Sequence, residues 1–167
     1  MSKKATATKP EREAVKSYLQ QYHTAKQKKR ILEERRRTLA AELRGPSTPP
    51  YRAMPSSKPV HPDGAGAVVF QIADVEERIE AQQAEMARAV QNVMDLIDLL
   101  PVGSTERTVV EMRHIDCKPW DQIAGAVYMS RSAVFNYYNA ALDMLARNEQ
   151  SGKLLGNFKS RNRGAKK

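Results

Sequence analysis

The chain has 167 residues, and its 28 Lys and Arg against 19 Asp and Glu give it a net charge of +9. No apolar run approaches the roughly 20 residues that span a membrane. The single cysteine, Cys117, excludes an internal disulfide, and the three histidines are scattered without the spacing of a zinc site. Since a glycine-rich phosphate loop and a Ser-His-Asp arrangement are also missing, we expect a soluble cytoplasmic protein that is not an enzyme and needs no cofactor or metal.

Positive charge is concentrated at the two ends of the chain. Residues 1–44 carry 13 basic and 5 acidic side chains, and residues 149–167 carry 6 basic and 1 acidic. Residues 67–103 have the opposite sign, with 2 basic and 7 acidic side chains, and residues 104–148 balance at 5 and 5. Basic blocks of this kind attract polyanions, of which nucleic acid is the commonest inside a cell.

The first half of the chain is predicted to contain one helix and one linker. Residues 1–44 form a basic N-terminal segment that is helical from Glu11 to Arg44, with Pro10 at its first turn. Residues 45–66 hold six of the nine prolines. Because proline removes a backbone donor and disfavours helix in the residue before it, this segment is expected to be a flexible Pro/Gly-rich linker.

Residues 67–103 are predicted to form a long amphipathic helix of the coiled-coil type, because apolar residues recur at alternating steps of three and four. Its expected seam is Val69, Ile72, Glu76, Ile79, Gln83, Met86, Val90, Val93, Ile97 and Leu100. A weaker seam in the N-terminal helix is Val15, Tyr18, Tyr22, Ala25, Lys29, Leu32, Arg36, Leu39 and Leu43. A basic helix and an acidic one suit pairing within one chain, whereas pairing between chains is the alternative; a homo-oligomer, with a dimer favoured, is expected.

Residues 104–148 are predicted to form a helix-turn-helix. Ser104 or Thr105 caps a first helix, Pro119 opens a second, and Ser130 is a strong N-cap for a third that continues through Leu145. The expected structural core of the motif is Trp120, Ile123, Ala124, Val127 and Val134, with Tyr137 also facing inward. His114 is expected on the surface or half-buried, and Cys117 as an inert thiol. A plain three-helix bundle that touches no nucleic acid is the alternative.

A helix of this kind fits the major groove of double-stranded DNA and presents the side chains of its first turns to the bases. The residues expected to face the DNA are Ser130, Arg131, Ser132, Phe135, Asn136 and Asn139. Basic residues of the two ends are expected to contact phosphates: Lys28, Lys29, Arg30, Arg35, Arg36, Lys159, Arg161 and Arg163. The tail 149–167 is expected to be disordered.

The motif resembles region 4 of the sigma-70 class, in the variant of phage and prophage late-gene transcription regulators of the ArpU and RinA type. The residues that carry the resemblance are Glu106, Arg107, Val110, Met112, Arg113, His114, Trp120, Ile123, Ala124, Ser130, Val134, Ala141, Leu142 and Leu145. The resemblance implies an activator of phage late genes in a bacterial host cell, with RNA polymerase as a possible partner. The chain departs from the pattern at Tyr128, where glycine is usual, so the backbone there must be left-handed or the turn different.

The sequence therefore predicts an all-α protein: long coiled-coil-like helices joined by a Pro-rich linker, followed by a C-terminal helix-turn-helix. Two other functions stay open. A phage small terminase subunit also binds packaging DNA through a helix-turn-helix and coiled helices, although it usually places the DNA-binding element first. A pure interaction protein would dock the motif on RNA polymerase or a sigma factor and read no DNA.

Overall fold

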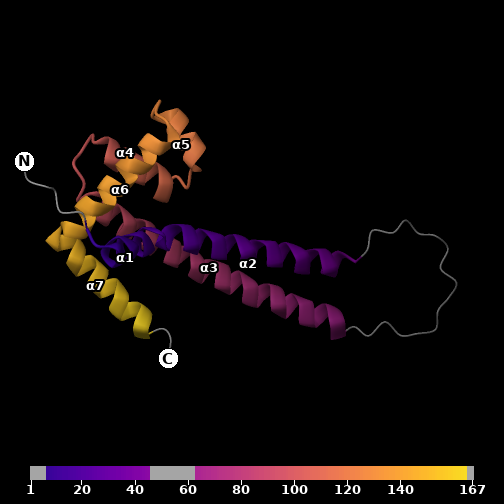
Figure 1. Cartoon of the computed structure of the whole chain (residues 1–167). Coiled ribbons are helices and arrows are strands. Elements are labelled where there is room, and N and C mark those ends of the chain that lie inside the picture. The colour runs from indigo at the N-terminus through magenta and orange to yellow at the C-terminus, as the bar shows by residue number, and fades with distance from the viewer. Residues whose placement is uncertain (1–6, 46–62, 165–167) are drawn as a thin grey trace, which may run out of the picture. The chain divides into compact units, whose positions relative to one another are not determined.

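The computed structural model describes residues 7–45 and 63–164, without the side chains of 63–65 and 161–164. In this part of the chain every regular element is a helix, which confirms the all-α prediction (Figure 1). The helices are α1 (Lys9–Leu19), α2 (Gln21–Arg44), α3 (Asp63–Ile97), α4 (Thr105–His114), α5 (Trp120–Ala126), α6 (Arg131–Arg147) and α7 (Glu149–Gly164). None of the described helices is long and apolar enough to cross a membrane.

The chain divides into two compact units. Lys26–Glu85, called the helical pair below, holds most of α2 and the first part of α3. The residues up to Ala25 and those from Met86 onward form the other unit, called the helical domain below.

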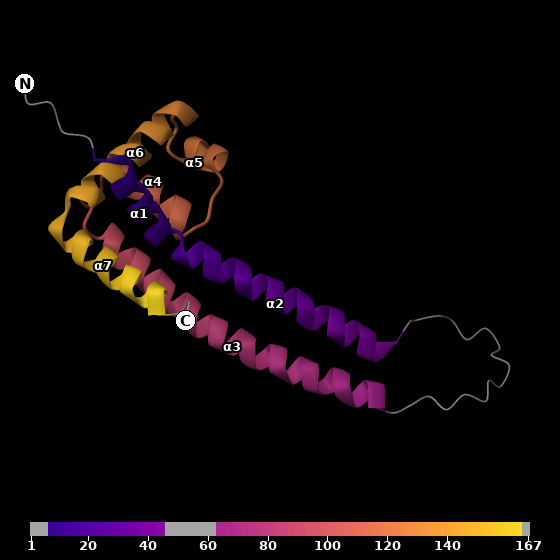
Figure 2. The ribbon, with the colours of Figure 1, turned by 60° about the horizontal axis from the view of Figure 1, so that its bottom comes forward.

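In the helical pair, α2 and α3 lie side by side in both Figure 1 and Figure 2. Val75 and Ile79 of α3 are only 5% and 8% exposed. Within α2, the Lys29 Nζ atom lies 3.4 Å from a Glu33 carboxylate oxygen. Between the two helices, the Arg36 guanidinium of α2 lies 3.5 Å from a Glu76 carboxylate oxygen of α3. The basic helix therefore pairs with the acidic one within the same chain.

The buried stripe of α3 differs from the predicted seam at every second position. Ile72, Ile79 and Met86 lie on it as predicted, but Val75 is buried where Glu76 was predicted to be. Glu76 is exposed and reaches Arg36 instead. The reason is that the residue three positions or the residue four positions after Ile72 can face the partner helix. Here the one three positions on, the apolar Val75, is buried.

The expected boundaries of the linker and of the long helix also need correction. Most of the predicted linker, 46–62, lies outside the described residues, but α3 begins at Asp63, directly after the last proline of that segment. The helix ends at Ile97 and not at Pro101–Gly103, because the Leu99 and Leu100 amides donate to carbonyls only three residues back. The long helix thus begins earlier and ends earlier than the predicted span 67–103.

The predicted single N-terminal helix is two helices, interrupted at Gln20. The side-chain amide of Gln21 donates to the Tyr18 carbonyl at 2.8 Å, so a side chain occupies an acceptor of the last turn of α1. Val15, Tyr18 and Leu19 of α1 are buried in the core of the helical domain and do not extend a coiled-coil seam. The N-terminal segment thus belongs in part to the folded domain that contains α4–α6.

The core of the helical domain gathers apolar side chains from five helices and the loop after α3. Its buried members are Val15, Tyr18, Leu19, Val93, Leu96, Ile97, Leu100, Val109, Val110, Ile123, Val134, Tyr138, Ala141, Leu142 and Leu145. The half-buried Leu154, Leu155 and Phe158 of α7 pack against them. Because α4, α5 and α6 all contribute to this one core, the turn between α5 and α6 is held from both sides.

The prediction of a disordered tail at 149–167 is wrong for residues 149–164, which form α7. Ser151 is fully buried, and the ring of Phe158 meets Tyr18 of α1 edge-on, with 5.2 Å between centroids. The basic composition of the segment concealed this stripe of Leu154, Leu155 and Phe158, whose spacing of three and four residues suits one face of a helix.

Candidate nucleic-acid interface

Helix α4 is fixed by its N-cap and by its packing. The Ser104 hydroxyl oxygen accepts from the Arg107 amide at 3.2 Å, which satisfies one of the free donors of the first turn. Val109 and Val110 are fully buried in the core. Of all helix pairs in the chain, α4 and α6 have the most extensive contact, so α4 supports the helix that is predicted to face DNA.

The turn between α5 and α6 closes α5 with two backbone hydrogen bonds. The Met129 amide donates to the Ala124 carbonyl at 3.0 Å, and the Tyr128 amide donates to the Gly125 carbonyl at 3.3 Å. This is the Schellman pattern, in which the residue after the cap is left-handed and is usually glycine. Here that residue is Tyr128, with φ of +53° and a side chain that is 96% exposed. Of the two alternatives that the sequence left open here, a left-handed backbone or a different turn, the structure has the left-handed backbone.

Helix α6 begins directly after this turn. The Ser130 hydroxyl oxygen accepts from the Ala133 amide at 3.2 Å, so Ser130 is the N-cap, as its residue type predicts. One side of α6 is buried in the core through Val134, Tyr138, Ala141, Leu142 and Leu145. The other side exposes Arg131, Ser132, Asn136 and Asn139. The first turns of α6 thus present polar side chains on a helix that is held rigidly from behind.

Phe135 does not lie free on that exposed side, contrary to its predicted role. It is half-buried, and its ring packs on Trp120 of α5 with centroids 4.5 Å apart. Trp120 in turn meets Tyr138 edge-on at 5.0 Å. Since Trp120 already offers an aromatic surface to α6, Phe135 buries more of its apolar area by covering that surface than by standing in solvent, and this burial is favourable.

The aromatic pair of Trp120 and Phe135 is flanked by two guanidinium groups. Arg113 of α4 lies over the Trp120 ring at 4.8 Å, and Arg131 of α6 lies over the Phe135 ring at 5.9 Å. Arg113 also donates to the Lys118 carbonyl at 3.0 Å. From the sequence, Arg131 was expected to face the DNA and Arg113 only to belong to the resemblance, and nothing in the helical spacing connects the two.

Arg131 has a second neighbour, Asp121 of α5. The Arg131 Nη1 atom lies 3.4 Å from an Asp121 carboxylate oxygen, and both side chains are largely exposed. An aromatic ring and a carboxylate therefore both contact the guanidinium of the first residue of α6.

A buried polar pair that was not predicted from the sequence joins His114 at the end of α4 to Tyr138 on the buried side of α6. His114 is 4% exposed, so its predicted place, on the surface or half-buried, is wrong, and its Nε2 lies 3.0 Å from the Tyr138 hydroxyl. Burial, helped by the charge of Arg113, lowers the pKa of His114 to about 4. Burial also raises the pKa of Tyr138 to about 12, so the phenol keeps its proton and can donate a hydrogen bond to the neutral imidazole.

Tyr138, and not Tyr137, is therefore the inward tyrosine; Tyr137 is half-buried. The recurrence of Val134, Tyr138, Ala141 and Leu145 at steps of four, three and four carries the signal for this. Of the predicted core of the motif, Ile123 and Val134 are fully buried, whereas Trp120, Ala124 and Val127 are half-buried.

The predicted phosphate contacts are dispersed. Lys28, Arg30, Arg35 and Arg36 are exposed on α2 and Lys159 on α7, whereas Lys29 is half-buried. Lys29, Arg30 and Arg36 each have a Glu within 4 Å, namely Glu33, Glu34 and Glu76. Arg161 and Arg163 lie in α7, but their side chains are outside the described part of the structure.

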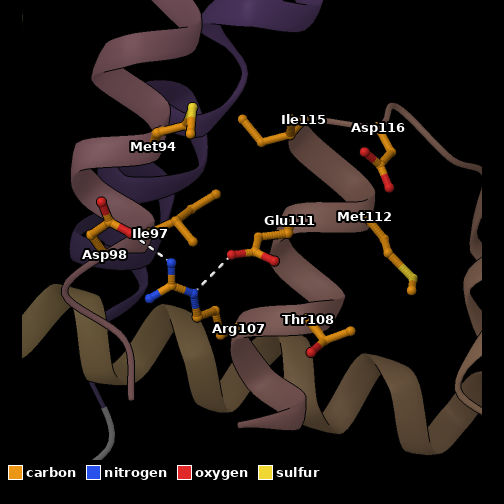
Figure 3. A pocket seen from close by; sticks show the side chains of 9 residues that line it. All are labelled: Met94, Ile97, Asp98, Arg107, Thr108, Glu111, Met112, Ile115 and Asp116. Carbon is orange, nitrogen blue, oxygen red and sulfur yellow. Dashed lines mark hydrogen bonds and ion pairs between the residues drawn. The ribbon is translucent and has the colours of Figure 1, made fainter. Parts of the chain in front are cut away.

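A groove of about 360 Å³ lies between the end of α3 and α4 (Figure 3). Arg107 stands at one end of it and donates to Asp98 at 2.6 Å and to Glu111 at 2.8 Å. These contacts, above all the hydrogen bond with Glu111, raise the pKa of the Arg107 guanidinium. The remaining lining is largely apolar or acidic and includes Met94, Met112 and Asp116. Carboxylates at this surface suit a protein better than they suit DNA.

In the residues that the structure describes, no group of His, Cys, Asp or Glu side chains could hold a metal ion. Cys117 is half-buried in the turn after α4, where its thiol points to the Ile115 carbonyl at 3.7 Å.

Comparison of the chain with protein-family models, with curated proteins and with solved structures finds no match.

Proposed function

We propose that α5, its left-handed turn and α6 form a helix-turn-helix that binds double-stranded DNA, with α6 as the recognition helix. The observation that carries the proposal is the division of α6 into a buried side and an exposed side. Val134 and Tyr138 anchor the helix, while Arg131, Asn136 and Asn139 stand in solvent on its first three turns. Arginine and asparagine are the side chains that pair bidentately with guanine and adenine in the major groove.

Affinity for the DNA backbone then comes largely from outside this motif. Residues 104–148 have no net charge, whereas residues 1–44 carry a net charge of +8 and residues 149–167 of +5. Exposed cations such as Lys28 and Lys159 are able to release counterions from phosphates but read no sequence. We infer a protein in which one element specifies the site and others supply the attraction.

The biological role proposed is that of a transcription regulator, in line with the resemblance to the phage late-gene regulators. Its partners would be promoter DNA and RNA polymerase in a bacterial cell. A homodimer is proposed because a helix-turn-helix reads a half-site, and two copies give the spacing of one helical turn.

Selection of binding sites from random duplexes by the full chain tests the proposal. We expect an enriched sequence. We also expect Asn136→Ala to relax the preference at one position of that sequence, since a good bidentate contact between a side chain and a base contributes roughly 1–3 kcal/mol of discrimination. Asn157→Ala, which changes an exposed asparagine of α7, is the matched control and should leave the preference intact. Failure to enrich any sequence would contradict site-specific DNA binding.

A second candidate function, a protein-docking module, is favoured by the groove beside Arg107. Its lining of methionine and carboxylate side chains suits an apolar side chain flanked by Lys or Arg on a protein. Mobility shifts with and without RNA polymerase separate the two functions: a shift that always requires polymerase would favour docking. A ring of many subunits by mass in solution would instead favour the terminase alternative.

A further inference from the structure

The contact between Asp121 and Arg131 places a negative charge at the start of the proposed recognition helix. Asp121 belongs to α5, is 78% exposed and lies within 3.4 Å of the Arg131 guanidinium. The Asp121 side chain has no part in the apolar core, and it is not the N-cap of α5, which is Pro119. Its one described ion pair is therefore the one with a residue proposed to read bases.

The guanidinium of Arg131 is held from two directions. The Phe135 ring lies 5.9 Å from it, and that ring is itself fixed on Trp120 at 4.5 Å. A guanidinium between an aromatic face and a carboxylate loses less side-chain entropy when it binds than a free one does. Phe135 alone, however, could orient the Arg131 guanidinium, so orientation does not explain why an acidic residue lies beside it.

The acidic residue has a second consequence, which depends on the DNA sequence. On DNA of any sequence, Asp121 is repelled by the phosphates and competes with them for Arg131. Where a guanine faces Arg131, its N7 and O6 atoms accept two hydrogen bonds in a fixed geometry and compensate for the lost ion pair. A repulsive element of this kind weakens wrong complexes more than the right one.

We propose that Asp121 is a specificity-determining residue of the DNA site, which acts through Arg131 to weaken binding to non-cognate DNA. The inference rests on the proposed function. It predicts that Asp121→Asn strengthens binding to a random duplex about threefold, as expected for one exposed ion pair. Binding to the selected duplex should change less, so that the ratio of the two affinities falls.

The experiment compares the full-length chain and its variants on the selected duplex and on a random duplex of equal length by fluorescence anisotropy. Asp95→Asn, which removes one exposed carboxylate of α3, is the control for net charge. We expect Asp121→Asn to lower the affinity ratio and Asp95→Asn to leave it unchanged. In an Arg131→Gln background, Asp121→Asn should leave the ratio of the two affinities unchanged, because only the direct repulsion from the phosphates then remains and it is the same on both duplexes.

Two results would overturn the inference and leave the proposed function in place. One is an equal effect of Asp121→Asn and Asp95→Asn on both duplexes, since that would be a simple effect of net charge. The other is a full effect of Asp121→Asn in the Arg131→Gln background. If the unmodified chain prefers no sequence, it is the proposed function that fails.

Discussion

Arg12 of α1 grips Asp143 of α6 with two hydrogen bonds of 2.6 Å each, from Nε to Oδ1 and from Nη2 to Oδ2. The Ala7 amide also donates to Oδ1, at 3.2 Å. The carboxylate side chain is only 15% exposed and that of Arg12 26%. A planar, two-pronged pair of this kind fixes direction as well as distance. The N-terminal segment thereby becomes a structural support for the helix proposed to read DNA.

We expect Arg12→Gln to lower the free energy of unfolding by about 1–2 kcal/mol, because the Asp143 carboxylate would lose charge-assisted hydrogen bonds at a half-buried site. Urea denaturation followed by circular dichroism measures this. Lys16→Gln removes the exposed pair with Glu13 on the same helix and should cost much less. Equal effects of the two changes would show that the Arg12 pair has no special weight.

Tyr128 provides a test of the turn between α5 and α6. Its φ of +53° is unfavourable for a side chain with a Cβ atom, and its ring is exposed. Tyr128→Gly should therefore stabilise the helical domain by about 0.5–1 kcal/mol, measured as a rise in the thermal midpoint. Tyr128→Ala keeps the Cβ atom and should bring no such gain. A loss of stability in the glycine variant would contradict the left-handed turn.

The buried His114 should make the domain sensitive to acid. Its pKa is lowered in the folded protein to about 4, so between pH 6.5 and 4 the unfolded chain binds a proton that the folded chain does not. Stability conferred by the neutral imidazole is complete above about pH 6.5 and falls as the pH drops, by on the order of 3 kcal/mol.

Urea denaturation at several pH values checks this expectation. His114→Gln should be less stable than the unmodified chain at pH 7.5, and the difference should shrink as the pH approaches 4. His23→Gln changes an exposed histidine whose charge is the smallest of the causes that lower the pKa of His114, and it should alter the pH dependence of the unmodified chain only slightly. A constant difference between His114→Gln and the unmodified chain would mean that folding leaves the pKa of His114 unchanged.

Helix α7 should behave as part of the fold and not only as a basic extension. Phe158→Ala removes the edge-on contact with Tyr18 and should cost about 1–2 kcal/mol, less than the 3–5 typical of a fully buried Phe because Phe158 is half-buried. The neighbouring Lys159→Ala changes an exposed residue and should leave stability within about 0.5 kcal/mol. An unchanged thermal midpoint in Phe158→Ala would contradict the packing of α7 on the helical domain and would favour a tail that is not attached to it.

The sequence predicted the helices better than it predicted what they pack against. Ser130 as an N-cap and the left-handed backbone at Tyr128 are local properties of residue type and turn geometry, and both are seen. The choice between Val75 and Glu76 at the seam depends on the partner helix. Valines stand at both 68 and 69, and both Leu96 and Ile97 are apolar, so periodicity alone allows either stripe.

The contacts that the sequence analysis missed are long-range ones. Leu19 has no place in the predicted seam, and Tyr18 was expected to face a second long helix; only the docking of α1 shows that both lie in the core of the helical domain. The same holds for Phe135, which looks exposed by helical spacing until Trp120 is placed beside it. The prediction for α7 was wrong because the basic composition of residues 149–167, with six basic side chains, outweighed three well-spaced apolar ones.

The most direct test of the proposed DNA-reading role of α6 is NMR of the full chain, labelled with ¹⁵N at its asparagine side chains and titrated with the selected duplex. Asn136 and Asn139 lie on the exposed side of α6, whereas Asn92 of α3 donates to Gln21 at 3.2 Å and Asn157 lies on α7. We predict that the amide signals of Asn136 and Asn139 shift on binding and that the Asn92 signal stays in place. Shifts at Asn157 with none at Asn136 and Asn139 would contradict the account, because the DNA would then be bound by the basic end of the chain alone.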